Sequence, residues 1–201
     1  CVAILDLTAG VLAILIGSGM ATAVVRMHFD THDEDERAKV WCTGLIWILL
    51  AATLFAVPML LGRQFLADLT LGNSITDGAF FYLLALGKLW LNTVSELLET
   101  YLRTKKWSGI YVSASLGRLL LNIGLNVWLL VGLELGVTGL LTGNLIAAFA
   151  NTLLLTIVFL RSQRRLAFDS GILRRLLSFG SPLIIQALLS MLMHEADRYI
   201  L

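Results

Sequence analysis

Charged residues are scarce in this chain. Only 14% of its 201 residues are charged, whereas about a quarter of a typical soluble domain is. Hydrophobic residues make up 58%, and the mean hydropathy is +0.84. This composition excludes an ordinary water-soluble core, and the net charge of +1 indicates no nucleic-acid partner.

Motifs of several enzyme classes are also missing. Two cysteines, Cys1 and Cys42, are too few for a disulfide framework. The chain has no G-x-x-x-x-G-K-[ST] phosphate-binding loop, and His194-Glu195 lacks the second histidine of the zinc motif H-E-x-x-H. We therefore expect neither an enzyme nor a bound cofactor, and an unidentified coupling cation is left open.

Apolar stretches of membrane length recur along the whole chain. They cover roughly residues 1–25, 42–62, 78–99, 108–131, 137–160 and 176–201. Each has about 20 residues or more, which suffices to span ~30 Å of hydrocarbon as a helix. The ten-residue alternation of a transmembrane barrel is absent. The sequence predicts an all-α polytopic transmembrane bundle of about six spanning helices.

The charges between these segments predict an orientation. The five successive loops contain 3, 1, 3, 0 and 5 Lys or Arg residues. Because cytoplasmic loops are enriched in Lys and Arg, the first, third and fifth loops are predicted to be cytoplasmic. In this orientation segment 1–25 begins on the external side of the membrane. A cytoplasmic N-terminus would therefore need one more helix before Cys1. Trp41 and Trp107 lie near segment ends, as interfacial anchors do.

Two cytoplasmic loops have unusual compositions. Residues 161–175 are basic with apolar residues interleaved, which fits either a short helix in the membrane interface or a solvated linker. The run HFDTHDEDE places His28 and His32 beside five acids. We interpret it as a solvated hairpin rather than a site for a divalent ion.

Two basic residues lie in the middle of apolar segments, Lys88 in 78–99 and Arg118 in 108–131. Each costs about 3 kcal/mol at the bilayer centre, and such residues usually face a polar interior. At about 100° per residue, polar residues form a stripe on each of four segments. The stripes contain Lys88, Asn92, Ser95 and Glu99; Ser108, Tyr111, Ser115, Arg118, Asn122 and Asn126; Asn144 and Asn151; and Gln186, Ser190 and Asp197.

The stripes have two interpretations. One is a shared water-filled cavity that is positive near mid-depth, and the other is interhelical hydrogen bonding with a buried Lys88–Glu99 or Arg118–carboxylate pair. For single Asn or Ser residues we favour hydrogen bonding. For Lys88 and Arg118 we favour the cavity, because neither has an acid beside it at the same depth of its own segment.

Four motifs carry a family resemblance. They are GMATAVVRMHF followed by DEDER, then YLRTKKW, LGVTGLLTGNLIAA and LLSFGSPLIIQALLSMLMHEADRYIL. In their order and spacing they resemble bacterial polysaccharide or O-antigen flippases of the multidrug/oligosaccharidyl-lipid/polysaccharide exporter superfamily. The resemblance implies that the chain holds helices two to seven of a two-lobe transporter. Residues 1–160 would be five helices of the N-terminal lobe, 161–175 an amphipathic cytoplasmic interfacial linker and 176–201 the first helix of the C-terminal lobe.

The resemblance also implies a function. The protein would flip a polyprenyl-pyrophosphate-linked oligosaccharide across the bacterial inner membrane by alternating access. Its partners would be this lipid-linked oligosaccharide and membrane lipids, with polysaccharide polymerase or assembly proteins left open. Lys88 and Arg118 would meet the pyrophosphate. The remaining candidate cavity residues are Asn92, Asn122, Asn126, Asn144, Gln186, Asp197 and Arg198.

Several alternatives stay open. A cation-coupled multidrug exporter would favour an acidic cavity, whereas the mid-depth charges here are basic. A peptidoglycan lipid flippase is a further close alternative. A membrane-embedded glycosyltransferase or ligase would need acidic catalytic residues and a large external loop, but loops 63–77 and 132–136 are short. A purely structural subunit is the remaining option. A two-lobe transporter further predicts that the Gln186 and Ser190 face is not covered by the first five segments.

Overall fold

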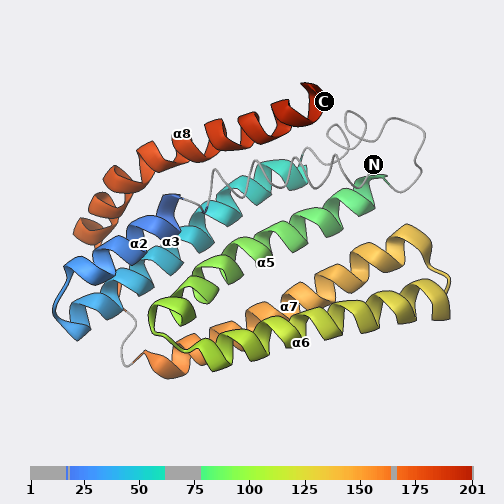
Figure 1. The fold of residues 1–201 in the computed structure, drawn as a ribbon, viewed down its shortest axis with the longest axis horizontal. Helices are drawn as coiled ribbons and strands as arrows, with labels where there is room; N and C mark the ends of the chain where they lie inside the picture. The colour runs from blue at the N-terminus through green and yellow to red at the C-terminus, as the bar shows by residue number, and fades with distance from the viewer. Residues whose placement is uncertain (1–16, 18, 62–77, 164–166, 201) are drawn as a thin grey trace.

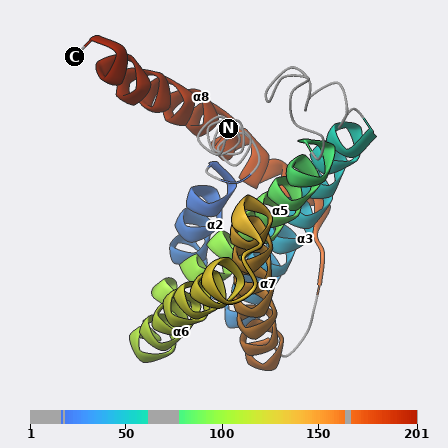
Figure 2. The same cartoon turned by 90° about the vertical axis from the view of Figure 1, so that its right-hand side faces the viewer.

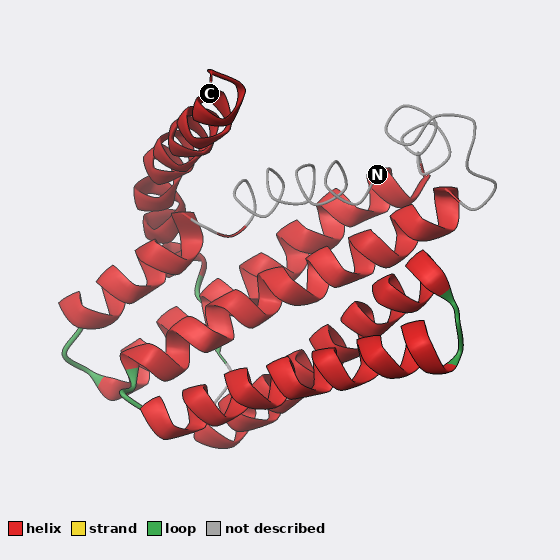
Figure 3. Cartoon of the chain, turned by 45° about the vertical axis from the view of Figure 1, so that its right-hand side comes forward, coloured by secondary structure: helices red, strands yellow, loops and turns green. Residues whose placement is uncertain are grey.

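The structure is a computed structural model that describes residues 17, 19–61, 78–163 and 167–200. All regular structure in these residues is helical (Figures 1 and 3). The helices are α2 (Gly19–Asp30), α3 (Glu34–Leu61), α5 (Gly78–Thr104), α6 (Ser108–Val127), α7 (Gly136–Ser162) and α8 (Ser170–Ile200), with the π-helical turn η2 (Trp128–Gly132) after α6.

Three stretches in the described part of the chain are long and apolar enough to cross a membrane. They are Glu34–Leu61, Ser108–Gly132 and Gly136–Ser162. Helix α5 has 27 residues, but Lys88, Glu96 and Glu99 interrupt its apolar sequence. The prediction of an all-α membrane helix bundle is confirmed, and most of the predicted span 1–25 lies outside the described residues.

Helix α5 lies at the centre of the bundle. It packs against α7, α3, α2 and α6, and α6 and α7 form an antiparallel pair (Figures 1 and 2). Helix α8 packs against α2 and α3, on the opposite side of α5 from the α6–α7 pair (Figure 2). Two T-shaped ring contacts join three helices inside the core, Trp41 to Tyr101 and Tyr101 to Phe159, each with centroids 5.0 Å apart.

The start of α8 is held by its capping residue. The Asp169 carboxylate accepts the backbone N–H groups of Ile172 and Gly171 at 3.1 and 2.7 Å, which satisfies donors at the helix N-terminus. The hydrogen bond from Ile172 and, to a smaller extent, the one from Gly171 lower the pKa of Asp169 below its usual value. The Asp169 backbone N–H donates to Thr43 Oγ1 of α3 at 3.1 Å. Residues 170–175 are the first turns of α8, and the interfacial position of 161–175 stays a prediction.

Two expectations about side chains near the first cytoplasmic loop are wrong. Trp41 is only 1% exposed and does not anchor at an interface, because α2 and α5 cover it. Its indole N–H donates to His28 Nδ1 at 3.1 Å, and His28 is 6% exposed rather than solvated. His32 and the acids from Asp33 to Glu36 are exposed, as predicted. Trp107, at the turn between α5 and α6, is 37% exposed.

The loops predicted to be cytoplasmic lie at one end of the bundle. Lys105 Nζ, after α5, lies 3.4 Å from Glu34 Oε2 at the start of α3. Tyr101 and Ser162 hydroxyls, near the ends of α5 and α7, are 2.6 Å apart. The turn between η2 and α7, which contains Glu134, lies at the other end (Figure 1). The loops that the charges predict to lie on one side of the membrane therefore share one end of the bundle, and the cytoplasmic orientation stays a prediction.

Candidate functional site

A polar network joins α5, α6 and α7 inside the bundle. Arg118 on α6 donates from Nη2 to Asn92 Oδ1 on α5 at 2.8 Å. Its Nη1 lies 3.6 Å from Glu99 Oε1, also on α5. Asn151 on α7 donates from Nδ2 to the same Glu99 oxygen at 3.4 Å. One guanidinium and one carboxylate therefore connect three helices.

A second set of polar contacts lies further along the same face of α6. Asn126 Nδ2 donates to Asn122 Oδ1 at 2.7 Å, and Asn122 Nδ2 donates to Asn144 Oδ1 on α7 at 2.8 Å. Asn126 Oδ1 is buried and has no hydrogen-bond partner among the described residues. A Cβ at Gly143 would lie 2.6 Å from this oxygen, so glycine makes room for the amide. The α6–α7 interface thus contains three carboxamides.

Helical spacing explains which residues meet. Arg118, Asn122 and Asn126 follow one another at intervals of four, so they lie on one face of α6. Lys88 lies one turn before Asn92 on α5 and is half-buried. The hydrogen bonds of Arg118 with Asn92, of Asn122 with Asn144 and of Asn126 with Asn122 agree with the prediction that these polar residues share helix faces.

The structure contains an Arg118–carboxylate pair, which the sequence analysis left open as the alternative to a cavity. Glu99 supplies the carboxylate from the neighbouring helix. The sequence shows no acid beside Arg118 in its own segment, and this pair depends on how α5 and α6 pack. The side chains of Arg118 and Glu99 remain 34% and 25% exposed, so the pair can be reached from outside the protein core.

The last helix does not join this network in the structure. Helix α8 packs against α2 and α3, and Gln186 and Ser190 are both exposed. This exposure confirms the expectation that their face is not covered by the preceding helices. The side chains of Asp197 and Arg198 lie outside the part of the chain that the structure describes.

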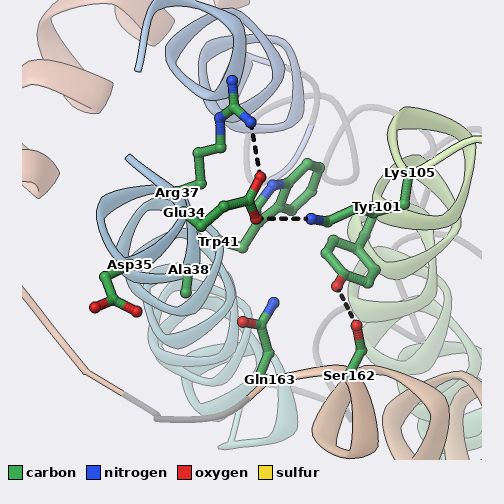
Figure 4. Close-up of a pocket in the computed structure, with 9 residues that line it drawn as sticks. All are labelled: Glu34, Asp35, Arg37, Ala38, Trp41, Tyr101, Lys105, Ser162 and Gln163. Carbon is green, nitrogen blue, oxygen red and sulfur yellow. Dashed lines mark hydrogen bonds and ion pairs between the residues drawn. The ribbon is translucent and has the colours of Figure 1, made fainter. Parts of the chain in front are cut away.

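A cavity of about 320 Å³ opens at the end of the bundle where the basic loops meet (Figure 4). Glu34 bridges two bases there, Arg37 at 2.9 Å and Lys105 at 3.4 Å. The buried rings of Trp41 and Tyr101 also line the cavity. Sequence reasoning missed this bridge because Glu34 and Lys105 are 71 residues apart. In this bridge the charge of Glu34 is paired with those of Arg37 and Lys105, and the contact with Lys105 joins the start of α3 to the turn after α5.

Comparison with known proteins gives the family. A family model described as "Polysaccharide biosynthesis protein" matches residues 1–201. The chain belongs to this family. No curated protein and no solved structure matches it.

Membership of the polysaccharide biosynthesis family confirms the flippase-type resemblance found in the sequence. It supports a role in polysaccharide biosynthesis and involvement with lipid-linked saccharides and membrane lipids. The helices that can cross a membrane make this a membrane protein. The Arg118 network is the candidate site because it combines a cation with amides, the groups that recognise phosphate and sugar hydroxyls.

Proposed function

We propose that this protein moves a polyprenyl-pyrophosphate-linked oligosaccharide across the bacterial inner membrane as a multi-pass transporter, without chemical conversion. The observation that supports this most is the position of Arg118. Its guanidinium lies where α5, α6 and α7 meet, is oriented by Asn92 and is 34% exposed. A charged group in a membrane helix that keeps access to its surroundings is typical of a substrate pathway.

The chemistry of the cargo matches the groups in the network. A pyrophosphate needs cations to replace its water, and the planar guanidinium of Arg118 can bind two phosphate oxygens at once. Lys88 adds a compact positive charge on α5. Asn92, Asn122, Asn126 and Asn144 provide amides for sugar hydroxyls. The lipid tail would stay in the bilayer beside the site.

Alternating access requires a second wall for the cargo path. The exposed Gln186 on α8, with Asp197 and Arg198 further along the helix, would contribute to that wall as α8 moves relative to α5–α7. Such transporters rock one helical bundle against another around a fixed site.

Replacing the two mid-membrane bases tests the proposal. Arg118→Ala and Lys88→Ala should each reduce export of surface polysaccharide at least about tenfold, since losing a buried charged contact costs roughly 2–5 kcal/mol. Arg118→Lys should retain part of the export, because the charge remains and the bidentate geometry is lost. The measurements are surface polysaccharide by immunoblot and the amount of protein in purified membranes.

Arg161→Ala is the matched control, because Arg161 is exposed at the end of α7 and lies outside the network. It should export normally. Normal export by both Arg118→Ala and Lys88→Ala, with normal membrane levels, would show that these bases serve only helix packing.

A further inference from the structure

We propose that Glu99 is an internal counter-ion that competes with the phosphate of the cargo for Arg118. This inference rests on the proposed function, in which Arg118 binds that phosphate. In the structure Glu99 pairs with the guanidinium, and the phosphate of the bound cargo would take its place.

The two contacts of Arg118 differ in strength. The hydrogen bond from Nη2 to Asn92 is 2.8 Å long, within the usual range for a charged donor. The distance from Nη1 to Glu99 is 3.6 Å, which is longer than a tight ion-pair hydrogen bond. Asn92 therefore holds the guanidinium in place, and the contact with Glu99 is the one that an incoming anion can replace.

Glu99 keeps a partner when it releases Arg118. Asn151 on α7 donates to the same carboxylate oxygen at 3.4 Å. The Glu99 carboxylate keeps this amide donor and is partly exposed, while Arg118 gains the phosphate. The exchange therefore leaves neither charge without a partner. In the reverse step, Glu99 returns to Arg118 as the phosphate leaves and the empty carrier can reset.

Competition has a measurable consequence for affinity. Breaking the Arg118–Glu99 pair opposes cargo binding, so removing the negative charge of Glu99 should strengthen binding. The same change should slow export, because the internal anion no longer helps to displace the cargo. A purely structural ion pair predicts the opposite for binding, since a disrupted site binds its ligand less well.

Titration calorimetry with farnesyl pyrophosphate tests the proposal on the full-length protein purified in detergent. Glu99→Gln should bind this probe about tenfold more tightly than the wild type, since a competing charge pair of this kind typically contributes that much. Binding of farnesol, which has the tail without the phosphates, should not change. Export of surface polysaccharide by Glu99→Gln should fall.

Glu96→Gln is the matched control. Glu96 lies one turn before Glu99 on α5 and forms no ion pair in the described part of the chain. Its replacement removes the same charge from the same helix and should leave the affinity unchanged. Equal tightening by Glu96→Gln would overturn the proposal, because the effect would then be general electrostatics and not competition at Arg118.

Further outcomes separate this inference from the proposed function. Unchanged or weaker binding by a folded Glu99→Gln protein overturns the competition, even if Arg118→Ala abolishes binding. If Glu99→Gln does not fold, Glu99→Asp is the variant to test, because its shorter side chain reaches Arg118 less well. Tighter binding of farnesyl pyrophosphate by Glu99→Asp supports the proposal, and unchanged binding overturns it. Wild-type protein that binds farnesyl pyrophosphate no better than farnesol overturns the proposed function itself.

Discussion

At the scale of single residues, His28 shows how burial selects a protonation state. Its ring is 6% exposed, and its Nδ1 accepts the indole N–H of Trp41 at 3.1 Å, which requires an unprotonated nitrogen. Burial, and then the charges of Arg37 and Lys105, lower the pKa of His28 below 6.5. His28 follows the predicted span 1–25, so these neighbours belong to the loop end of the bundle.

The lowered pKa of His28 predicts a pH-dependent stability. Below about pH 6.5 the unfolded chain binds the proton more readily than the folded one, so stability should fall as the pH falls from 6.5 towards the folded pKa. Thermal unfolding in detergent should show a falling midpoint between about pH 7 and 5. His28→Gln keeps an acceptor for Trp41 but does not titrate, and should weaken this dependence.

His32→Gln is the matched control for this measurement, because His32 is exposed in the same loop. It should leave the pH profile of the wild type intact. A His28→Gln protein with the full wild-type dependence would mean that other groups cause it.

At the scale of helices, α2 and α8 make an unusually close contact. They cross at Gly19 and Gly180, which are both buried. A Cβ on Gly19 would collide with the Gly180 carbonyl oxygen, and a Cβ on Gly180 would lie 3.1 Å from the Gly19 carbonyl oxygen. Backbone atoms cannot relieve such a clash by a rotamer change, as side-chain atoms can. Small residues at such crossings let membrane helices approach closely.

Gly19→Ala should therefore push α2 and α8 apart. We expect it to lower the stability of the detergent-solubilised protein by roughly 1–3 kcal/mol, as overpacking does. Gly117→Ala on α6 is the control, because a Cβ there has nothing within 4 Å. It should be neutral or stabilising by about 0.5–1 kcal/mol, since alanine favours helices. The measurement is the thermal unfolding midpoint, and equal midpoints for the two variants would refute the close crossing.

At the scale of the whole molecule, the ends of the helices divide into two groups. The basic loops meet at one end, where Glu34 joins Arg37 and Lys105. Glu134 lies in the turn at the other end (Figure 1). A membrane helix bundle needs this division, because each span must begin and end on opposite sides of the bilayer.

Single-cysteine labelling tests which end is cytoplasmic. With Cys1 and Cys42 replaced, an impermeant maleimide should label Glu134→Cys in intact cells, because the positive-inside rule puts the loop without Lys or Arg outside. Glu36→Cys, at the exposed basic end, should be labelled only after the cells are permeabilised. The reverse pattern would invert the predicted orientation.

Local spacing explains how much of this structure the sequence predicts. Apolar length predicted the helices, since a span needs a continuous run of apolar residues. Intervals of three and four residues predicted that Arg118, Asn122 and Asn126 share one face, because the helical period depends only on the local backbone. The loop charges predicted which ends lie together. None of these predictions depends on which helices are in contact.

The amino-acid sequence by itself therefore determined the helices, their polar faces and the family. Tertiary packing decided what each face meets. Glu99 pairs with Arg118 because α5 and α6 bring them together, and Trp41 is buried because α2 and α5 cover it. Helix α8 lies on α2, away from the Arg118 network. Helical periodicity orients a side chain about its own axis, but only the packing of helices distant in sequence supplies its partner.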